Sequence, residues 1–469
     1  MNRLSLYHKL PYPLKSLAAS LHGYRLRFRR YGKDSERLVE EALERERWSW
    51  EEWRSWQQAH LAEILELAAK QVPYYRDYWN KRRQKGDRAS WAYLENWPVL
   101  KKDPLRKSPR AFVVEGTDFR TLIEEHTSGT TGTPLTIWRN LATERQWYAL
   151  YEARVRRWNG FSYRDRWAIL GAQPIIPVTQ QHPPFWVWNA GLNQLYLSAI
   201  HISETFISSY VEALWKYRVR YLLGYPFALA LIVRLAEKAG LPLPQLDAVI
   251  TNSEILLPEI RSILSYGFRG RVVDTYGMSE TVAAASECRF GHMHIWPDAG
   301  VIEVLRDEED KPVDKTETGR LILTGLLNPI MPLIRYEIGD RGRWSSDTTP
   351  CECGRQMPVL AEINGRMDDV LLSPDGRCID AVIAVVFKAD LPIREAQVIQ
   401  KAINLLEIRV VPEAGFSNHD VDVLVKRIKK ISGENMHVDV VEVDVIPRGP
   451  NGKFRFIVSL LDHSSPLSL

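Results

Sequence analysis

The feature that most constrains the fold is an alternation between residues 120 and 300, where short apolar runs are separated by longer amphipathic stretches. The runs at 167–170, 221–223, 248–251 and 272–275 have the length and composition of buried strands. Residues 227–239 have the apolar spacing of a helix that ends at Gly240. Because strands that alternate with helices build layered sheets that are at least partly parallel, the sequence predicts an α/β fold.

The pattern changes after residue 300. Runs at 301–305 and 319–323 predict strands on either side of an acidic loop at 307–314. The last hundred residues have helix patterns at 381–387 and 421–431 and an alternating strand pattern at 441–445. We therefore expect a large domain over 1–365, with layered α/β sheets, a β-rich subdomain and a mostly helical first hundred residues. A small α+β domain is expected over 366–469.

Charge and cysteine content exclude several classes of protein. The 62 basic and 58 acidic residues leave a net charge of +4, too little for a dedicated nucleic-acid-binding protein. Four cysteines in 469 residues cannot form a disulfide framework, which favours a reducing compartment. No apolar run approaches the roughly 18 residues of a membrane span. These observations predict a cytoplasmic protein.

Residues 1–33 contain eight Lys or Arg and no acidic residue. Two interpretations stay open. The segment is either an ordinary solvated surface or a peripheral contact with an anionic membrane, to which each basic residue adds about 1 kcal/mol.

A segment rich in glycine and hydroxyl groups covers residues 127–134, Thr-Ser-Gly-Thr-Thr-Gly-Thr-Pro. Glycines let backbone N–H groups approach an anion and hydroxyls add neutral donors, so the segment predicts either a phosphate-binding loop or an ordinary polar turn. It is not the P-loop motif, because no Gly-Lys-[Ser/Thr] follows.

Four later segments follow in a fixed order, at 275–280, 335–340, 365–369 and 447–455. Together with 127–134 they resemble the adenylate-forming superfamily of acyl-CoA synthetases and luciferases. The phenylacetate–CoA ligase branch and its capsular-polysaccharide CapK-type members are the most similar. The resemblance covers nearly the whole chain and includes residues 72–76, 97–102, 184–189 and 224–226.

The resemblance implies an adenylate-forming fold, whose small domain is mobile, and assigns roles to individual residues. The ATP-binding set that it implies is Thr127, Ser128, Gly129, Thr130, Thr131 and Gly132 for the phosphates, Ser253, Glu254, Tyr276 and Gly277 for the adenine, Ser279 for a phosphate, and Asp340 with Arg366 for the ribose. Lys453, Glu280 and Thr131 would be catalytic, with Mg²⁺ on Glu280, and Asp368 would be the hinge.

The implied activity is ATP-dependent conversion of a carboxylic acid to an acyl-AMP. The acyl group would then pass to CoA, a carrier-protein thiol or an amine, in surface-polysaccharide or specialised-metabolite biosynthesis. A non-catalytic nucleotide-binding or scaffold protein of the same fold is the alternative. Thr133 supports that alternative, because many relatives carry a lysine there that contributes a cation to the phosphate loop.

Three cysteines and a histidine have a pattern typical of structural zinc. Cys288 precedes His292 and His294, and Cys351 and Cys353 follow in a loop. Three thiolates and one imidazole make a closed tetrahedral Zn²⁺ site, although Cys-x-Cys is tighter than the usual Cys-x₂-Cys. Some members of the resembling branch carry a similar set. His294 is the expected fourth ligand, His292 is its alternative, and three reduced loop cysteines without metal are the other interpretation.

Overall fold

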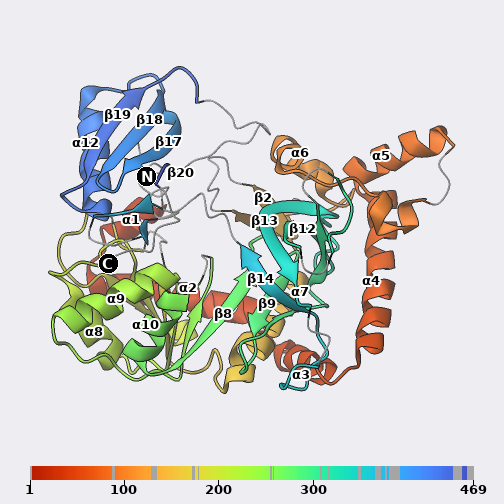
Figure 1. Ribbon diagram of the computed structural model, residues 1–469, viewed down its shortest axis with the longest axis horizontal. Coiled ribbons are helices and arrows are strands. Elements are labelled where there is room, and N and C mark those ends of the chain that lie inside the picture. Colours follow the sequence, from red (N-terminus) through yellow and green to blue (C-terminus); the bar gives the residue numbers. More distant parts are fainter. Residues whose placement is uncertain are drawn as a thin grey trace.

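The computed structural model describes residues 3–86, 90–127, 135–171, 175–177, 179–253, 256, 258–306, 309–314, 317–346, 350–364, 371–374, 378–379, 391–446 and 457–461. A mixed twelve-stranded sheet with helices on its faces forms the large body, and a separate four-stranded sheet forms the C-terminal domain (Figure 1).

The helices of the described residues are α1 (Arg3–His8), α2 (Tyr12–Arg30), α3 (Ser35–Arg45), α4 (Trp50–Gln71), α5 (Pro73–Gln84), α6 (Lys102–Lys107), α7 (Leu141–Tyr151), α8 (Ile207–Lys216), α9 (Pro226–Lys238), α10 (Pro258–Phe268) and α12 (Asn418–Ser432). The strands are β1 (Ile123–His126), β2 (Thr136–Arg139), β3 (Trp167–Gly171), β4 (Trp186–Asn189), β5 (Gln194–Ser198), β6 (Tyr221–Gly224), β7 (Ala248–Thr251), β8 (Arg271–Gly277), β9 (Ala284–Glu287), β10 (Met293–Ile295), β11 (Gly300–Leu305), β12 (Gly319–Gly325), β13 (Tyr336–Trp344), β14 (Val359–Asn364), β15 (Leu371–Leu372), β16 (Cys378–Ile379), β17 (Ile393–Ala402), β18 (Leu405–Pro412), β19 (His437–Glu442) and β20 (Ile457–Ser459).

One half of the large sheet is parallel. Strands β5, β3, β6, β7 and β8 run in the same direction, with β4 antiparallel at the edge. Leu222 and Val249 pack against the helices α8, α9 and α10, whereas Leu223 and Ile250 belong to the core on the opposite face, with α3 and α7. Burial on both faces explains why these strands read as continuous apolar runs in the sequence.

The other half of the sheet is antiparallel. Strands β9 to β14 continue from β8 in the spatial order β8, β9, β10, β14, β13, β12, β11. Their inner face packs against α4 and α5 through a core that includes Leu65, Trp79, Leu321 and Tyr336. This half is the β-rich subdomain that the sequence predicts, and in Figure 1 it lies beside the long helix α4.

Helix α2 packs closely against the edge of the parallel half. A Cβ atom on Gly23 would lie 1.7 Å from Asn189 Oδ1, and one on Gly191 would lie 2.2 Å from the backbone nitrogen of Tyr24. The Ser20 hydroxyl also accepts a hydrogen bond of 3.0 Å from the backbone nitrogen of Ala190. Only glycines permit this approach, so one face of α2 is fixed to the sheet.

The C-terminal domain has the spatial strand order β19, β18, β17, β20, and α12 packs on it. Its apolar core includes Val398, Ile408 and Leu424, and Ile200 of the large domain joins this cluster. Lys430 Nζ also donates to the carbonyl of Gln180 at 3.3 Å. The expected boundary at residues 365 and 366 and the expected helix at 381–387 lie outside the described residues.

Most of the expected elements that fall within the described residues are confirmed, with one correction. The strand expected at 441–445 is wrong in its bounds, since β19 ends at Glu442. The first hundred residues are mostly helical, and Ser49 caps α4 with its side chain, which separates it from α3. Strand β13 continues through Asp340 to Trp344. Within the described residues, no helix combines the length and the apolarity that a membrane span needs.

Candidate nucleotide and metal sites

The residues expected to bind ATP lie where parallel strands end. Ser253 follows β7, and Gly277, Ser279 and Glu280 end or follow β8, the neighbouring parallel strand. The carboxyl edge of such a sheet is where ligands bind in open α/β folds. Ser253 and Thr281 have φ values of 67° and 54°, a left-handed conformation that is strained for residues other than glycine. The fold therefore holds both loops in sharp turns at this edge.

Two hydrogen bonds join the end of β8 to β13. The Tyr276 hydroxyl donates to Asp340 Oδ2 at 2.9 Å, and the Tyr336 hydroxyl donates to Glu280 Oε1, also at 2.9 Å. Strands β9, β10 and β14 separate β8 from β13 in the sheet. The antiparallel half therefore curls back far enough to bring a tyrosine and a carboxylate of each segment together. This crossed pair joins Asp340 to the end of β8 and Glu280 to the start of β13.

Glu280 is buried, and its hydrogen bond from Tyr336 fixes one carboxylate oxygen. A carboxylate accepts several hydrogen bonds or cations, so Oε2 keeps acceptor capacity for a metal ion. Carboxylate oxygen is the ligand type that Mg²⁺ prefers, usually with water and substrate phosphate completing the shell. The carboxylate of Glu280 is therefore suited to bind Mg²⁺.

The ends of β7 and β8 are joined by side chains. The Thr251 hydroxyl donates to Asp274 Oδ1 at 2.6 Å, and the Thr275 hydroxyl donates to the Thr251 carbonyl at 2.7 Å. Burial raises the pKa of Asp274 to about 7, partly offset by the Thr251 hydrogen bond. These contacts hold the two loops of the site in a fixed relation.

The described residues on either side of the glycine- and threonine-rich segment, Thr127 and Leu135, lie at the end of the antiparallel hairpin β1–β2. Thr127 and Leu135 close the base of the loop through two hydrogen bonds of 3.0 Å, one between backbones and one from the Leu135 nitrogen to the Thr127 hydroxyl. From β2, Arg139 Nη1 donates to the Ser279 carbonyl at 3.3 Å. The hairpin therefore lies directly beside the loop that carries Ser279 and Glu280.

Several expected residues cannot be placed. Outside the described residues lie Ser128, Gly129, Thr130, Thr131, Gly132, Thr133, Glu254, Arg366, Asp368 and Lys453. Of the ATP-binding and catalytic set, the structure thus describes Thr127, Ser253, Tyr276, Gly277, Ser279, Glu280 and Asp340. The hydrogen bonds above bring four of these into one region: Tyr276, Asp340, Ser279 and Glu280.

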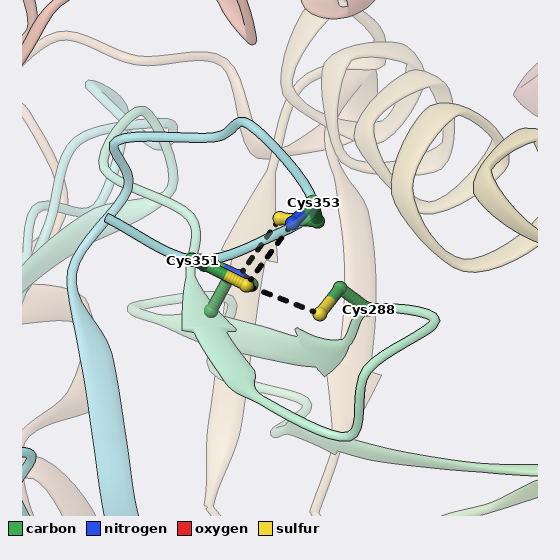
Figure 2. A group of neighbouring side chains, drawn as sticks. Cys288, Cys351 and Cys353 are labelled. Carbon is green, nitrogen blue, oxygen red and sulfur yellow. Dashed lines mark hydrogen bonds between the residues drawn. The ribbon is translucent and has the colours of Figure 1, made fainter. Parts of the chain in front are cut away.

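The second site gathers Cys288, His294, Cys351 and Cys353, whose ligand atoms all lie within 4.8 Å of one another. Figure 2 shows the three cysteines of this set. The sulfurs of Cys288 and Cys351 are 3.7 Å apart, and Cys353 Sγ is 3.4 Å from His294 Nε2. Bonds of about 2.3 Å to sulfur and 2.0 Å to nitrogen in a tetrahedral site require separations of this size. The four side chains therefore fit Zn²⁺ with little rearrangement.

The two histidines differ in their surroundings. His294 lies on β10 and is fully buried, and its Nδ1 is 3.1 Å from the Met357 carbonyl, which leaves Nε2 directed at Cys353. A ligand histidine in a protein ordinarily donates its other ring nitrogen in this way. Burial lowers the pKa of His294 to about 4, so the ring is neutral, as a metal ligand must be. His292 is exposed, with Nδ1 3.0 Å from Cys351 Sγ. The geometry favours His294.

Two matching turns present the cysteines. The backbone nitrogen of Gly291 donates to the Cys288 carbonyl at 3.0 Å, and that of Gly354 donates to the Cys351 carbonyl at 2.8 Å. Both glycines are left-handed, with φ values of 81° and 83°. Figure 2 shows the loop of Cys351 and Cys353 facing the turn of Cys288. The glycine at the fourth position of each turn is the sequence feature that the Cys288 turn and the Cys351 turn share.

Comparison with known proteins gives the family of the chain. The model of the AMP-binding enzyme family matches residues 65–328, more than half of the chain. The chain belongs to the AMP-binding enzyme family. The model of the CapK C-terminal domain matches residues 371–460, which contain the C-terminal sheet.

Two curated relatives support this placement among the AMP-binding enzymes. Protein CapK of Staphylococcus aureus is 25% identical over 408 residues, which cover 86% of this chain and 88% of CapK. A phenylacetate–coenzyme A ligase of Thermus thermophilus is 31% identical over 132 residues, 27% of this chain and 29% of the ligase. The chain is thus an adenylate-forming superfamily member close to CapK, as its motifs predict.

Solved structures have the same fold. A 2-hydroxyisobutyryl-CoA ligase in complex with 2-HIB-AMP and CoA, in its thioesterification state, has a TM-score of 0.56 and 19% identity, covering 88% of this chain and 91% of the ligase. Two structures of the same ligase in its postadenylation state have TM-scores of 0.51 and 0.52 and 20% identity, with the same coverage. The predicted adenylate-forming fold is confirmed.

Sequence reasoning missed Tyr336 and Arg139 as site residues. Tyr336 lies four residues before Asp340, as Tyr276 lies four residues before Glu280, and this repeated Tyr-x₃-acid spacing is a signal in both segments. Arg139 had no comparable signal, because its role depends on contacts with residues more than a hundred positions away in sequence.

Proposed function

We propose that this AMP-binding enzyme converts a carboxylic acid to an acyl-AMP and transfers the acyl group to CoA, a carrier-protein thiol or an amine. The observation that supports this most is the crossed pair of hydrogen bonds, Tyr276 to Asp340 and Tyr336 to Glu280. The pair fixes one oxygen of Asp340, the carboxylate proposed for the ribose hydroxyls, and one oxygen of Glu280, the carboxylate proposed for Mg²⁺. We extend the proposal to surface-polysaccharide or specialised-metabolite biosynthesis, the role that the resemblance of the motifs to capsular-polysaccharide CapK-type proteins implies.

The reaction has two steps. A carboxylate oxygen of the acid attacks the α-phosphorus of ATP, and the bond to the bridging oxygen breaks so that pyrophosphate leaves. A thiol or amine of the acceptor then attacks the acyl carbonyl, loses its proton and displaces AMP. Mg²⁺ held by Glu280 supplies positive charge at the phosphates when bound. Lys453 lies in the segment that resembles the lysine motif of the CapK-type proteins. It would bind the oxygens of the acid and of the α-phosphate in the first step.

The site's hydroxyl and backbone donors would orient the nucleotide. Thr127 lies at the base of the phosphate loop, and Ser279 lies next to Glu280. Asp340 accepts one hydrogen bond from Tyr276 and retains capacity for the ribose hydroxyls. Ser253 follows β7 and Tyr276 lies at the end of the adjacent strand β8, positions suited to border the adenine.

The deciding experiment is ATP–pyrophosphate exchange with the full-length protein over a broad panel of carboxylic acids. We expect exchange with at least one class of acid, and product analysis with CoA, phosphopantetheine or an amine then identifies the acceptor class. A protein that binds ATP in calorimetry but catalyses no exchange with any acid supports the scaffold alternative instead.

Replacing Asp340 by alanine is expected to raise the KM for ATP about 10- to 100-fold, because hydrogen bonds to a charged group contribute about 1.5–3 kcal/mol each. Its control is Tyr276→Phe, which keeps the carboxylate and removes one hydroxyl, and which we expect to change the KM less than tenfold. The measurement is KM for ATP and 2′-deoxy-ATP. If Asp340 binds the ribose, the wild-type protein discriminates between them and Asp340→Ala does not. Equal discrimination by both proteins contradicts the assignment.

We also propose that Cys288, His294, Cys351 and Cys353 hold a structural Zn²⁺. Support comes from the four converging ligands, the buried neutral imidazole and its Met357 contact. A site with four protein ligands leaves no open position for substrate, so the metal would stabilise the loop around Cys351 and take no part in the reaction.

A further inference from the structure

We propose that helix α2 binds the surface of an anionic lipid bilayer through an apolar stripe, defined as Leu14, Leu17, Leu21, Tyr24 and Phe28. The spacing is three, four, three and four residues, which places all five side chains on one face of the helix. This proposal does not depend on the proposed ligase activity.

The stripe is open to solvent. Its side chains are between 46% and 72% exposed, with Phe28 the most exposed of them. Seven of the seventeen exposed large hydrophobic side chains of the described residues lie in α1 and α2, so they are concentrated in 25 of the 469 residues, about 5% of the chain. An exposed apolar patch rimmed by polar residues marks an interaction surface.

The helix cannot turn its stripe inward. Its opposite face contains Gly23, which lies against Asn189, and Lys15, which is buried. Near its start, the Tyr12 hydroxyl is 2.9 Å from that of Tyr217 on the large domain. The stripe therefore faces outward because the other side of α2 is already packed.

The charges beside the stripe favour an anionic partner. Arg25 and Arg27 are exposed and lie on opposite sides of the stripe, and Lys9 and Lys33 are exposed beyond the ends of α2. Three other basic residues of 1–33 are buried or paired with a buried carboxylate. The segment is therefore not a wholly solvated surface, which corrects that interpretation of its charges. Lys15 is buried, and Arg29 and Arg30 pair with the buried Glu144 at 2.8 and 3.6 Å.

A second copy of the chain fits this surface less well than a lipid headgroup layer. Residues 1–33 contain no acidic side chain, so two stripes packed on each other would bring Arg25 and Arg27 of both copies together. The stripe also spans too few heptads for a typical coiled coil. An amphipathic helix with apolar and basic side chains on its outward face, by contrast, lies in the interface of an anionic bilayer. A bilayer satisfies both the apolar and the positive groups.

The test is cosedimentation of the full-length protein with vesicles of 70% phosphatidylcholine and 30% phosphatidylglycerol, and with pure phosphatidylcholine, at low and high salt. The stripe variant is Leu17→Ser/Leu21→Ser/Phe28→Ser. Its matched control is Tyr266→Ser/Val445→Ser/Leu460→Ser, which removes three equally exposed apolar side chains elsewhere. Arg25→Gln/Arg27→Gln tests the charges. Thermal melting verifies that all variants fold.

We expect binding to anionic vesicles that salt weakens, about tenfold or greater loss of affinity in the stripe variant, and less than twofold change in the control. The arginine variant is expected to bind more weakly and with less salt dependence. Absence of wild-type binding at low salt, or equal loss in stripe variant and control, overturns the proposal. The proposal is also overturned if the wild-type protein is a dimer and only the stripe variant is a monomer, because the partner of the stripe is then a second copy of the chain.

Discussion

Adenylation is expected to slow about 10²- to 10³-fold when Glu280 is replaced by glutamine, the effect of losing one preorganised electrostatic contact in a buried site. The amide keeps the size of the side chain and can still accept a hydrogen bond from Tyr336, so the packing around it is preserved. What it loses is the negative charge that binds Mg²⁺. The measurement is ATP–pyrophosphate exchange as a function of Mg²⁺ concentration, with the acid that wild-type protein uses best.

Tyr336→Phe is the matched control for this change. It removes the 2.9 Å hydrogen bond to Glu280 but keeps the carboxylate and the buried ring, so we expect about a tenfold loss at most. Both variants should convert a supplied acyl-AMP to product at nearly the wild-type rate, because pyrophosphate has already left. If Glu280→Gln exchanges as fast as wild type with the same Mg²⁺ requirement, Glu280 is not the metal ligand.

Protein purified without chelator is expected to contain about one zinc per chain, and removal of that zinc should destabilise the loop around Cys351. Metal binding of this kind contributes directly to folding, with apparent free energies of about 10–16 kcal/mol in zinc-finger peptides. The loop also reaches the rest of the fold through Arg355, which donates to Glu46 Oε2 at 3.0 Å and lies over the Trp158 ring. We therefore expect a lower melting temperature and faster proteolysis within 346–358 in the metal-free protein.

Point variants identify the ligands. Cys351→Ser and His294→Asn should lose zinc, whereas His292→Asn and Cys378→Ser should keep it, Cys378 lying on β16 of a different sheet. Cobalt substitution gives an independent readout, since tetrahedral thiolate coordination has a characteristic visible spectrum. Elemental analysis without stoichiometric zinc, or a spectrum that His292→Asn alone abolishes, contradicts the assignment.

Local signals of the sequence predicted the structure most directly. Thr127 and Leu135, the described residues on either side of the glycine- and threonine-rich segment, lie at the end of a hairpin. The strand expected at 272–275 is confirmed within β8, because a strand buried on both faces reads as a continuous run. The candidate zinc ligands came from residue type and spacing together with the family resemblance, and their side chains converge.

Contacts that depend on distant segments were beyond such reasoning. The meeting of Tyr336 with Glu280 requires the sheet to curl across three intervening strands, and no local pattern encodes that curvature. The choice between His292 and His294 likewise required knowing which one β10 buries. Counting charges in residues 1–33 did not reveal that Arg29 and Arg30 pair with Glu144, which lies more than a hundred residues away.

The close packing of α2 at Gly23 has a consequence for which positions of this helix can change. One side of the helix admits almost no substitution, because a Cβ there would overlap Asn189, whereas the five stripe residues on the other side are held by no comparable fit. Tolerance to substitution should therefore differ between the two sides of the helix. We expect the outer apolar residues to accept other side chains without loss of the fold, whereas a larger residue at Gly23 would displace the helix from the sheet.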